Sequence, residues 1–312
     1  MDDALHPEAQ ALLRTTEAAP FPPFQGLSVS AAREQLRTQT ASEEPEPVGA
    51  SEEFVIDGPD GNELAMRSYV PDADGPHPLL VYFHGGGFVL GDLDTSDVIC
   101  AALCNRAEWA VLSVDYRLAP EHPFPAGVED AYAAVEWAAT YGDRIGADTD
   151  RLAVGGDSAG GNLAAATALL SRNLDGPDIA HQLLIYPVMS APGIHDFDSY
   201  RENAEGYLLE AAEMVWYFEK YFESPIDRRN EYFSPLLADD LSGLPSASVL
   251  TAEFDPLRDE GQAYADRLDA VGIDVTRHHF EDMLHGFLTY PSILSRADDA
   301  YDALADDLAS VA

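Results

Sequence analysis

The sequence predicts an α/β fold in which helices cover both faces of a mostly parallel, doubly wound sheet, and three observations lead to this prediction. Strand-like and helix-like segments alternate from residue 54 to the end of the chain. Some strand-like segments, such as 79–83 and 111–114, are continuous apolar runs, which is typical of parallel strands buried on both faces. A third run, 152–155, passes through a glycine turn into an alanine-rich helix. We therefore expect reactive groups at the carboxyl ends of the strands.

The length and composition are those of a folded globular protein. The 312 residues suffice for one large α/β domain or two ordinary ones, and 46% of them are hydrophobic. No stretch approaches the roughly 20 apolar residues that span a bilayer, and the first residues lack the charged and apolar regions of a secretory signal. These features predict a soluble, cytoplasmic protein.

The balance of charge is strongly acidic. Asp and Glu number 56 against 17 Lys and Arg, a net charge of −39, and Lys220 is the only lysine. Such an excess repels nucleic acids and anionic membranes, so neither is an expected partner. The carboxylates are scattered along the whole chain, which predicts a surface adapted to molar salt, as in extreme halophiles. We expect stability and activity to fall sharply below roughly 0.5 M salt, where charges are screened less.

The two cysteines, Cys100 and Cys104, lie four residues apart in a helix-like segment. This spacing is compatible with a redox pair or half of a metal site. With no other cysteine and no histidine nearby, we expect instead two small buried residues on one helical face. The count excludes a disulfide framework.

Residues 1–50 differ from the rest of the chain. Two short amphipathic helices are expected, one beginning near Pro7 and one at about 30–40, followed by an acidic, proline-containing linker at 43–47. Two helices of this size cannot form a core alone, so they must cover another part of the molecule.

The remaining elements follow in order, beginning with an antiparallel pair of strands joined by a turn-rich loop. Strands are expected at 54–56, 64–70, 79–83, 111–114, 152–154, 183–186, 248–251 and 275–280. Helices are expected at about 95–107, 128–141, the segment after 161, 258–271 and 292–309. Each alternates with a strand, as a parallel sheet requires.

One segment, about 188–237, interrupts this alternation with a helix rich in large side chains. Together with residues 1–50 it could form a cap over the carboxyl edge of the sheet. Met214 and Phe218, at i and i+4, would then share one helical face as candidate walls of a substrate pocket. The expected organisation is an N-terminal cap region, 1–50, and a catalytic domain, 51–312, that contains the insertion.

Residues 156–160 read Gly-Asp-Ser-Ala-Gly and lie between a strand-like run and a helix. A strand, a sharp glycine turn and a helix in this order are typical of a nucleophile elbow, which raises the serine hydroxyl above the sheet. Glycine is needed on both sides because neighbouring backbone approaches closely there. Ser158 is therefore the candidate nucleophile.

A serine hydroxyl needs a base that takes its proton, and the base should follow it in the chain. His285 comes directly after the last expected strand. His195 lies in the insertion, while His278 and His279 fall within a strand, where adjacent side chains face opposite sides. His285 is the candidate base.

The base needs an orienting carboxylate, also at a strand end. Asp255 follows the strand-like segment 249–254 and precedes Pro256, which begins a helix. Asp259 would lie in the first turn of that helix, where it favours the helix dipole, and Asp282 fits a surface charge. We therefore assign Asp255 as the orienting acid.

The oxyanion of an acyl-transfer reaction needs backbone N–H donors. Residues 84–87 read His-Gly-Gly-Gly and follow a buried strand upstream of the elbow, so they suit that purpose. A flexible turn is the alternative. The run matches neither a P-loop nor a dinucleotide-binding pattern.

The chain as a whole resembles the bacterial and archaeal hormone-sensitive-lipase-like esterases of the α/β-hydrolase superfamily. The resemblance depends on motifs in the family's order at 84–87, 115–126, 156–160, 255–260 and 285–287. It implies an eight-stranded sheet and a cap built from the N-terminal helices and the insertion. It also implies Ser158 as nucleophile, His285 as base and then acid, and Asp255 as orienting residue.

The resemblance further implies that the N–H groups of Gly86, Gly87 and Ala159 form the oxyanion hole, with His84 shaping that loop. Members of the family cleave esters of short to medium acyl chains without metal or cofactor, and many form homodimers. The motif positions of Arg117 and Glu121 imply structural roles. The role of Asp157 stays open between holding the elbow loop and being merely tolerated.

Three other functions remain as alternatives to ester hydrolysis. A non-catalytic protein that binds a small ligand on the same fold would be expected to lack the catalytic histidine, whereas His285 is present. An amidase or deacetylase of small molecules would use the same catalytic groups. A lipase acting at lipid surfaces is disfavoured by the acidic charge and the lack of an amphipathic anchor.

Overall fold

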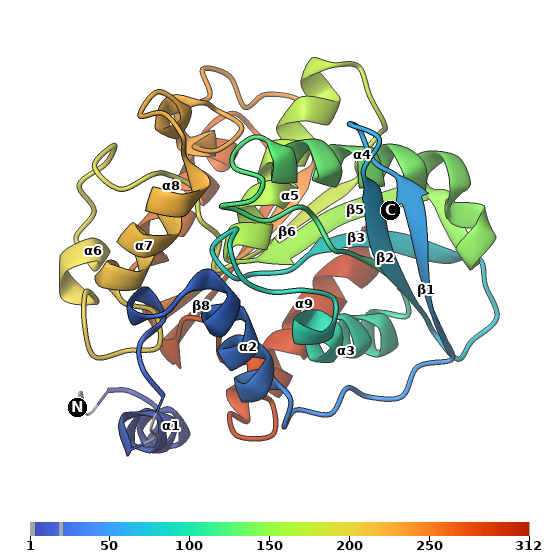
Figure 1. Ribbon diagram of the computed structural model, residues 1–312. Helices are drawn as coiled ribbons and strands as arrows, with labels where there is room; N and C mark the ends of the chain where they lie inside the picture. Colours follow the sequence, from blue (N-terminus) through green and yellow to red (C-terminus); the bar gives the residue numbers. More distant parts are fainter. Residues whose placement is uncertain (1–3, 19–20, 312) are drawn as a thin grey trace.

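An eight-stranded sheet runs through the molecule between two layers of helices (Figure 1). The computed structural model describes residues 4–18 and 21–311. The strands are β1 (Ala50–Asp57), β2 (Glu63–Val70), β3 (His77–Phe83), β4 (Ala110–Val114), β5 (Ala147–Asp157), β6 (His181–Ile185), β7 (Ser246–Phe254) and β8 (Val275–Leu284). Their order in the sheet is β1-β2-β4-β3-β5-β6-β7-β8.

The directions of the strands confirm the predicted sheet. β2 pairs antiparallel with β1 and β4, and all neighbours from β4 to β8 are parallel. The last strand is longer than predicted, because it continues to Leu284 instead of ending at Phe280. This extension brings the carboxyl end of β8 directly next to His285.

The helices divide between the two faces of the sheet. They are α1 (Pro7–Ala18), α2 (Val29–Thr40), α3 (Asp97–Ala107), α4 (Ala126–Tyr141), α5 (Ala159–Asn173), α6 (Ser199–Glu202), α7 (Ala211–Tyr221), α8 (Arg258–Ala270) and α9 (Arg296–Ser310). In Figure 1, α4 and α5 lie above the sheet, while α3 and α9 lie below it.

The central strand β3 shows why the core strands are continuous apolar runs. Leu79, Val81 and Phe83 belong to the core cluster with α4 and α5, whereas Leu80 and Tyr82 belong to the cluster with α3 and α9. Successive side chains of a strand point to opposite faces, so both sets are buried when both faces are covered. The strand can therefore be recognised in the sequence as an apolar run, although polar and apolar residues do not alternate along it.

The cysteines Cys100 and Cys104 lie on α3, both buried and both free. Burial raises the pKa of Cys104 to about 12 and that of Cys100 further, which keeps both thiols protonated. They are small core residues, as expected from the sequence.

The helix α2 is fixed to loops at the carboxyl edge of the sheet. Arg33 donates to the carbonyl oxygens of Val89 and Ala119, at 2.9 and 3.0 Å, and pairs with Glu121 at 2.7 Å. The short turn Phe24–Gly26, which precedes α2, contacts α7 in the insertion between β6 and β7. The two segments predicted to form a cap thus meet, while the division into a cap and a catalytic domain stays a prediction.

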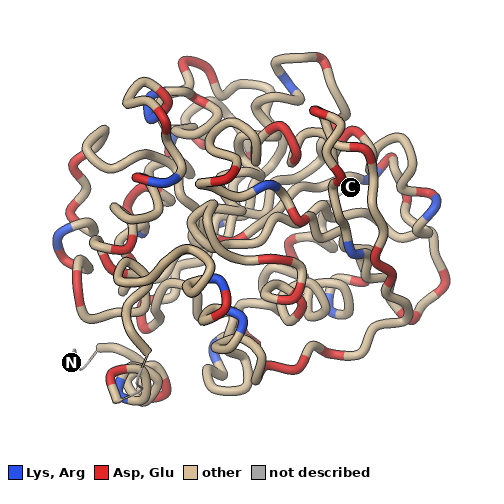
Figure 2. Tube along the Cα trace, in the orientation of Figure 1, with Lys and Arg blue, Asp and Glu red and all other residues tan. Residues whose placement is uncertain are grey.

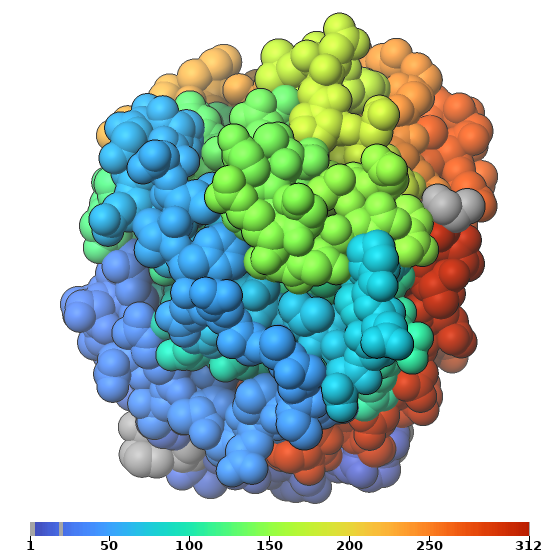
Figure 3. All heavy atoms as spheres, turned by 90° about the vertical axis from the view of Figure 1, so that its right-hand side faces the viewer, coloured from blue at the N-terminus to red at the C-terminus, as the bar shows by residue number. Residues whose placement is uncertain are grey.

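Acidic residues are spread along the trace in Figure 2 and are not gathered in one segment. Several arginines hold more than one carboxylate. Arg106, for example, joins Glu46, which precedes β1, to Asp298 and Asp302 on α9. Figure 3 shows the N-terminal (blue) and C-terminal (red) segments meeting at the lower part of the molecule. Among the described residues, the helices are all too short or too polar to cross a membrane.

Candidate active site

The turn after β5 holds Ser158 in a conformation that L-residues rarely adopt, with φ +55° and ψ −114°. The N–H of Ser158 donates to the carbonyl oxygen of Ile185 at 2.8 Å, and its own carbonyl accepts from Val188 at 3.1 Å. A Cβ added to Gly160 would lie 1.8 Å from the carbonyl oxygen of Phe83. The glycine therefore permits the close approach that the sharp turn requires. The backbone strain is concentrated at the candidate nucleophile.

The structure brings together the three residues predicted as a catalytic triad. The distance from His285 Nε2 to Ser158 Oγ is 3.0 Å, and that from His285 Nδ1 to Asp255 Oδ2 is 2.7 Å. Asp255 is fully buried, and its other oxygen accepts from the N–H of Leu257 at 2.8 Å. Both carboxylate oxygens are thus held, and the carboxylate fixes the orientation of the imidazole.

The other candidate histidines have different partners. His278 contacts Asp307 at 2.7 Å, and His279 contacts Glu253 at 3.0 Å, both at sites away from the serine. His195 lies in the insertion. The strand placement that disfavoured His278 and His279 in the sequence also separates them from the serine, because both lie in the middle of β8 and not at its carboxyl end.

The rival carboxylates are likewise engaged elsewhere. Asp259 lies in the first turn of α8, accepts from the N–H of Ser199 at 2.9 Å and pairs with Arg258. Asp282 pairs with Arg296 at 3.2 Å. Neither contacts His285 in the part of the chain that the structure describes.

The glycine-rich loop after β3 lies against the elbow. Gly86 and Gly87 have φ angles of +111° and +61°, a region that favours glycine. Within the described residues their N–H groups take part in no hydrogen bond. Ala159 is the first residue of α5, where a helix leaves N–H groups without intrahelical partners. The geometry is compatible with the predicted oxyanion hole, and this assignment stays a prediction.

Asp157 connects this loop to the elbow. Its Oδ1 accepts from the hydroxyl of Tyr82 at 2.8 Å and from the N–H of Gly85 at 2.9 Å. Burial raises the pKa of Asp157, and the Tyr82 hydrogen bond acts in the opposite direction. The side chain next to the candidate nucleophile therefore holds the donor loop in place, which resolves the alternative left open by the sequence. The partner Tyr82 was not foreseen.

His84, which precedes the glycines, contributes to the shape of the same loop. Its Nδ1 lies 2.7 Å from the carbonyl oxygen of Gly85, and its ring stacks on Tyr116 with centroids 4.4 Å apart. The hydroxyl of Tyr116 donates to the carbonyl of His84 at 2.8 Å. These contacts fit the role in shaping the loop that was expected of His84.

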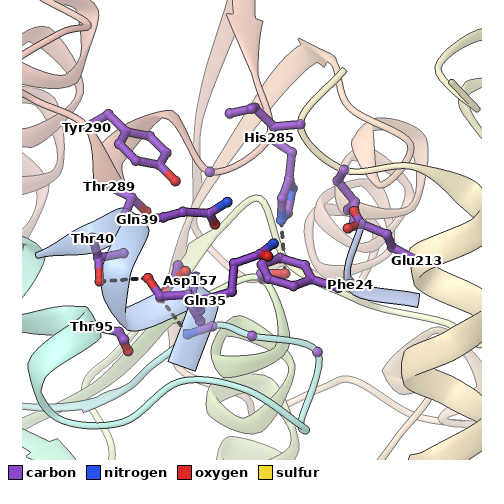
Figure 4. Close-up of a pocket in the computed structure, with 18 of the residues that line it drawn as sticks. Phe24, Gln35, Gln39, Thr40, Thr95, Asp157, Glu213, His285, Thr289 and Tyr290 are labelled. Carbon is purple, nitrogen blue, oxygen red and sulfur yellow. Dashed lines mark hydrogen bonds between the residues drawn. The ribbon is translucent and has the colours of Figure 1, made fainter. Parts of the chain in front are cut away.

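Ser158 and His285 open into a cavity of about 620 Å³ that has two unlike walls. One wall is largely apolar and comes from the insertion, where Met214, Tyr217 and Phe218 of α7 take part. The other is polar and carries amide and hydroxyl groups, shown in Figure 4 as Gln35, Gln39, Thr40, Thr95, Thr289 and Tyr290. Met214 and Phe218 thus line the cavity, and their contact with a substrate stays a prediction.

Several residues of the site could not be found in the sequence. The polar wall comes mainly from α2, whose glutamines and threonines carry no motif. Glu213 on α7 also lines the cavity and is 9% exposed. The ring of Tyr186, a non-glycine residue with φ +33°, lies 4.7 Å from that of His285. Each acquires its place only through packing between distant segments.

The arrangement supplies a nucleophile, a base and backbone donors beside a cavity. Among residues 4–18 and 21–311, no group of three or more His, Cys, Asp or Glu side chains is arranged so that it could hold a metal ion.

Comparison with known proteins relates this chain to a family of hydrolases and to several esterases. Residues 80–289 match the sequence family described as having the alpha/beta hydrolase fold. The chain is 39% identical to esterase LipI of Mycobacterium tuberculosis over 93% of this chain and 90% of that protein. It is 37% identical to an arylesterase of Saccharolobus solfataricus over 97% and 99%. The structure of a hyperthermophilic esterase from Pyrobaculum calidifontis superimposes with a TM-score of 0.92 and 40% identity, covering 98% of each chain.

Proposed function

The chain belongs to the hormone-sensitive-lipase-like family of the α/β-hydrolase fold and is a carboxylic ester hydrolase, and from this premise we propose how it acts. It hydrolyses short- to medium-chain acyl esters through an acyl-enzyme on Ser158, at high salt concentration. The observation that carries the proposal is the continuous hydrogen-bonded row from Ser158 through His285 to the buried Asp255.

In the first step, Ser158 Oγ attacks the carbonyl carbon of the ester while His285 Nε2 takes the hydroxyl proton. The N–H groups of Gly86, Gly87 and Ala159 are the donors that we assign to the developing oxyanion, because such donors stabilise charge as it forms. Collapse of the tetrahedral intermediate breaks the bond to the alcohol, which leaves with the proton from His285. The acyl group remains on Ser158 as an ester.

In the second step, water replaces the alcohol. His285 takes a proton from the water molecule, whose oxygen attacks the acyl carbon, and then returns the proton to Ser158 Oγ as the acid leaves. Asp255 holds the imidazole in the tautomer that both transfers need and stabilises its positive charge. The same residues serve both steps because the reaction is chemically symmetrical.

The dimensions of the cavity support the choice of substrate. A volume of about 620 Å³ holds a small ester with room for a moderate acyl or alcohol group. Met214 and Phe218 are the side chains that we propose to contact an apolar part of it. The net charge of −39 supports adaptation to salt. A cytoplasmic location and a homodimer remain predictions from the sequence.

A series of p-nitrophenyl esters of increasing acyl length, assayed at molar salt, tests the proposal. We expect the highest kcat/KM on short to medium chains. We also expect a loss of about 10⁴- to 10⁶-fold in kcat for Ser158→Ala, since the residues of a triad act as a unit. Circular dichroism of the variant serves as the control for folding. Equal rates for the two proteins on every ester would contradict the proposal and would favour a non-catalytic binding protein.

A further inference from the structure

Glu213 places a carboxyl group in the cavity at a position that no step of acyl transfer requires. The residue lies in the first turn of α7, is 9% exposed and lines the same cavity as Ser158 and His285. Figure 4 shows its carboxyl group directed towards the space beside the imidazole of His285, close to Phe24. A ligand bound at the serine would therefore pass near this group.

The described lining of the cavity contains neither lysine nor arginine. It contains three carboxyl groups, those of Asp157, Glu210 and Glu213. In an interior of low dielectric constant, a charged ligand group interacts with fixed charges more strongly than in water. A carboxylate on a substrate would meet like charges here, and an ammonium group would meet opposite ones.

The three carboxyl groups differ in how far they are already engaged. Asp157 accepts two hydrogen bonds, of 2.8 and 2.9 Å, and lies beneath the glycine-rich loop. Glu210 accepts from the N–H of Gly206 at 3.0 Å and caps α7. Glu213 accepts from the N–H of Glu210 across 3.5 Å and interacts with the N–H of Phe24, both of them backbone donors. Because a carboxylate has about four acceptor positions, Glu213 has capacity left for a ligand.

Two aromatic side chains line the cavity on the same side as this carboxyl group. Phe24 and Tyr217 line the same cavity, and Tyr217 follows Glu213 by one turn of α7. Burial raises the pKa of Glu213 to about 7, although the N–H groups of Glu210 and Phe24 oppose this rise. The faces of aromatic rings attract alkylammonium groups, so rings and carboxylate favour the same kind of ligand.

We propose that Glu213 makes this esterase selective for the charge of its substrate, with esters that carry an alkylammonium group preferred over neutral isosteres. The ammonium group would lie against the Glu213 carboxylate and the adjoining rings while the ester carbonyl is at Ser158. The inference rests on the proposed function, since both depend on an ester reaching Ser158 in this cavity.

Two matched pairs of esters test this proposal. In the first pair the alcohol is choline or its neutral isostere, in which tert-butyl replaces trimethylammonium. In the second pair the same replacement is made in the acyl group. The ratio of kcat/KM for the cationic over the neutral ester is measured at pH 8 in molar salt. Salt at this concentration reduces the screening length to about 3 Å, which removes the long-range attraction of the acidic surface for a cationic ester. The attraction between the buried Glu213 carboxylate and an ammonium group in contact with it is screened much less.

In Glu213→Gln, we expect this ratio to fall about tenfold for at least one pair, the effect of losing one close charge interaction. Intrinsic differences in ester reactivity cancel, because the same ratio is compared between two proteins. Glu219→Gln is the matched control, since Glu219 is exposed on the same helix and its removal changes the net charge equally. Its ratio should stay within about twofold of the wild type.

An unchanged ratio in Glu213→Gln for both pairs would overturn the proposal. If that variant does not fold, inhibition of the wild type decides: choline should inhibit at lower concentration than its tert-butyl isostere. Equal inhibition, or stronger inhibition by the neutral alcohol, would contradict a role for Glu213. Activity of Ser158→Ala on the neutral esters equal to that of the wild type would instead overturn the proposed function. The two failures are therefore distinguishable.

Discussion

One carboxylate oxygen of Asp255 contacts the backbone, and the other contacts His285, the proposed catalytic base. One oxygen accepts from the backbone N–H of Leu257 at 2.8 Å, and the other lies 2.7 Å from His285 Nδ1. The first contact fixes the carboxylate, and through the second the carboxylate fixes the imidazole. Asp255, at the end of β7, thus holds the imidazole of His285 in the orientation that the proposed proton transfer needs.

Replacement of Asp255 by asparagine should keep the shape of the site and lose its chemistry. We expect kcat to fall about 10⁴-fold, because an amide favours the wrong tautomer of His285. Steady-state kinetics on a p-nitrophenyl ester measure the effect. Asp259→Asn is the control, and its kcat should change by less than about threefold because Asp259 pairs with Arg258 instead. Similar losses in both variants would contradict the assignment of Asp255.

Glu260 illustrates a different use of a buried carboxyl group. It is fully buried on α8, accepts from the N–H of Met189 at 2.6 Å and is hydrogen-bonded by the hydroxyl of Tyr200. Burial raises the pKa of Glu260 to about 8 from 4.5. The folded protein therefore holds a proton on this group at pH values where the unfolded chain has released it.

This shift in pKa predicts a specific dependence of stability on pH. The contribution of protonated Glu260 is fully present below about pH 4.5 and is lost as the pH rises through about 8. The free energy of unfolding, measured by urea denaturation at several pH values in that window, should fall less steeply in Glu260→Gln than in the wild type. Glutamine keeps an acceptor for Met189 and does not ionise. Identical slopes for the two proteins would show that Glu260 does not titrate in this window.

At the scale of elements, Arg33 makes most of the polar contacts that attach the helix α2 to loops at the carboxyl edge of the sheet, and Arg37 adds an ion pair with Asp92. Arg33 contacts the carbonyl oxygens of Val89 and Ala119 and the carboxylate of Glu121. The carbonyl of Val89 belongs to the loop that follows Gly86 and Gly87, so the attachment also connects α2 to the candidate site. The polar wall of the cavity depends on this position of α2.

Loss of this attachment should loosen α2 before the sheet unfolds. In Arg33→Ala we expect faster hydrogen exchange of the α2 amides and a decrease of about 1–3 kcal/mol in the free energy of unfolding. The reason is that the carbonyl oxygens of the buried residues Val89 and Ala119 lose their hydrogen-bond donor. Hydrogen exchange detected by mass spectrometry measures the first effect. Arg151→Ala, which removes an ion pair with Asp148 within β5, is the control and should leave α2 unchanged. Equal exchange of α2 in both variants would contradict this role.

At the scale of the whole molecule, the net charge of −39 dominates the surface. Acidic residues are spread along the trace, as Figure 2 shows, and several arginines each contact more than one carboxylate. Arg67, for example, contacts Glu53, Asp94 and Asp97. Carboxylates that outnumber their cationic partners repel one another, and this repulsion destabilises the compact state at low ionic strength.

The melting temperature should therefore rise with salt. We expect a large increase in Tm between about 0.1 and 2 M NaCl, since the screening length falls from about 10 Å to below 3 Å. Thermal unfolding followed by circular dichroism measures it, and activity should fall in parallel below about 0.5 M. Sucrose is the control, because it stabilises by exclusion from the surface without screening charge. A Tm that is constant across this range would contradict adaptation to salt.

Much of the fold could be predicted because its signals are local in the sequence. The central strands of the sheet contain continuous apolar runs, and the elbow carries glycines that its backbone geometry requires. The end of β8 was predicted four residues too early. Its last part carries charged side chains, and only pairing with β7 continues the strand to Leu284.

The sequence alone determined the family, the sheet and the order of Ser158, Asp255 and His285, because each depends on residues adjacent in the chain at a strand end. Only the tertiary structure decided what surrounds them. Asp157 holds the donor loop through Tyr82, and Glu213 enters the cavity. These contacts join segments far apart in the sequence, so no local pattern records them. Packing between these segments forms the walls of the pocket, and the walls determine which substrates fit.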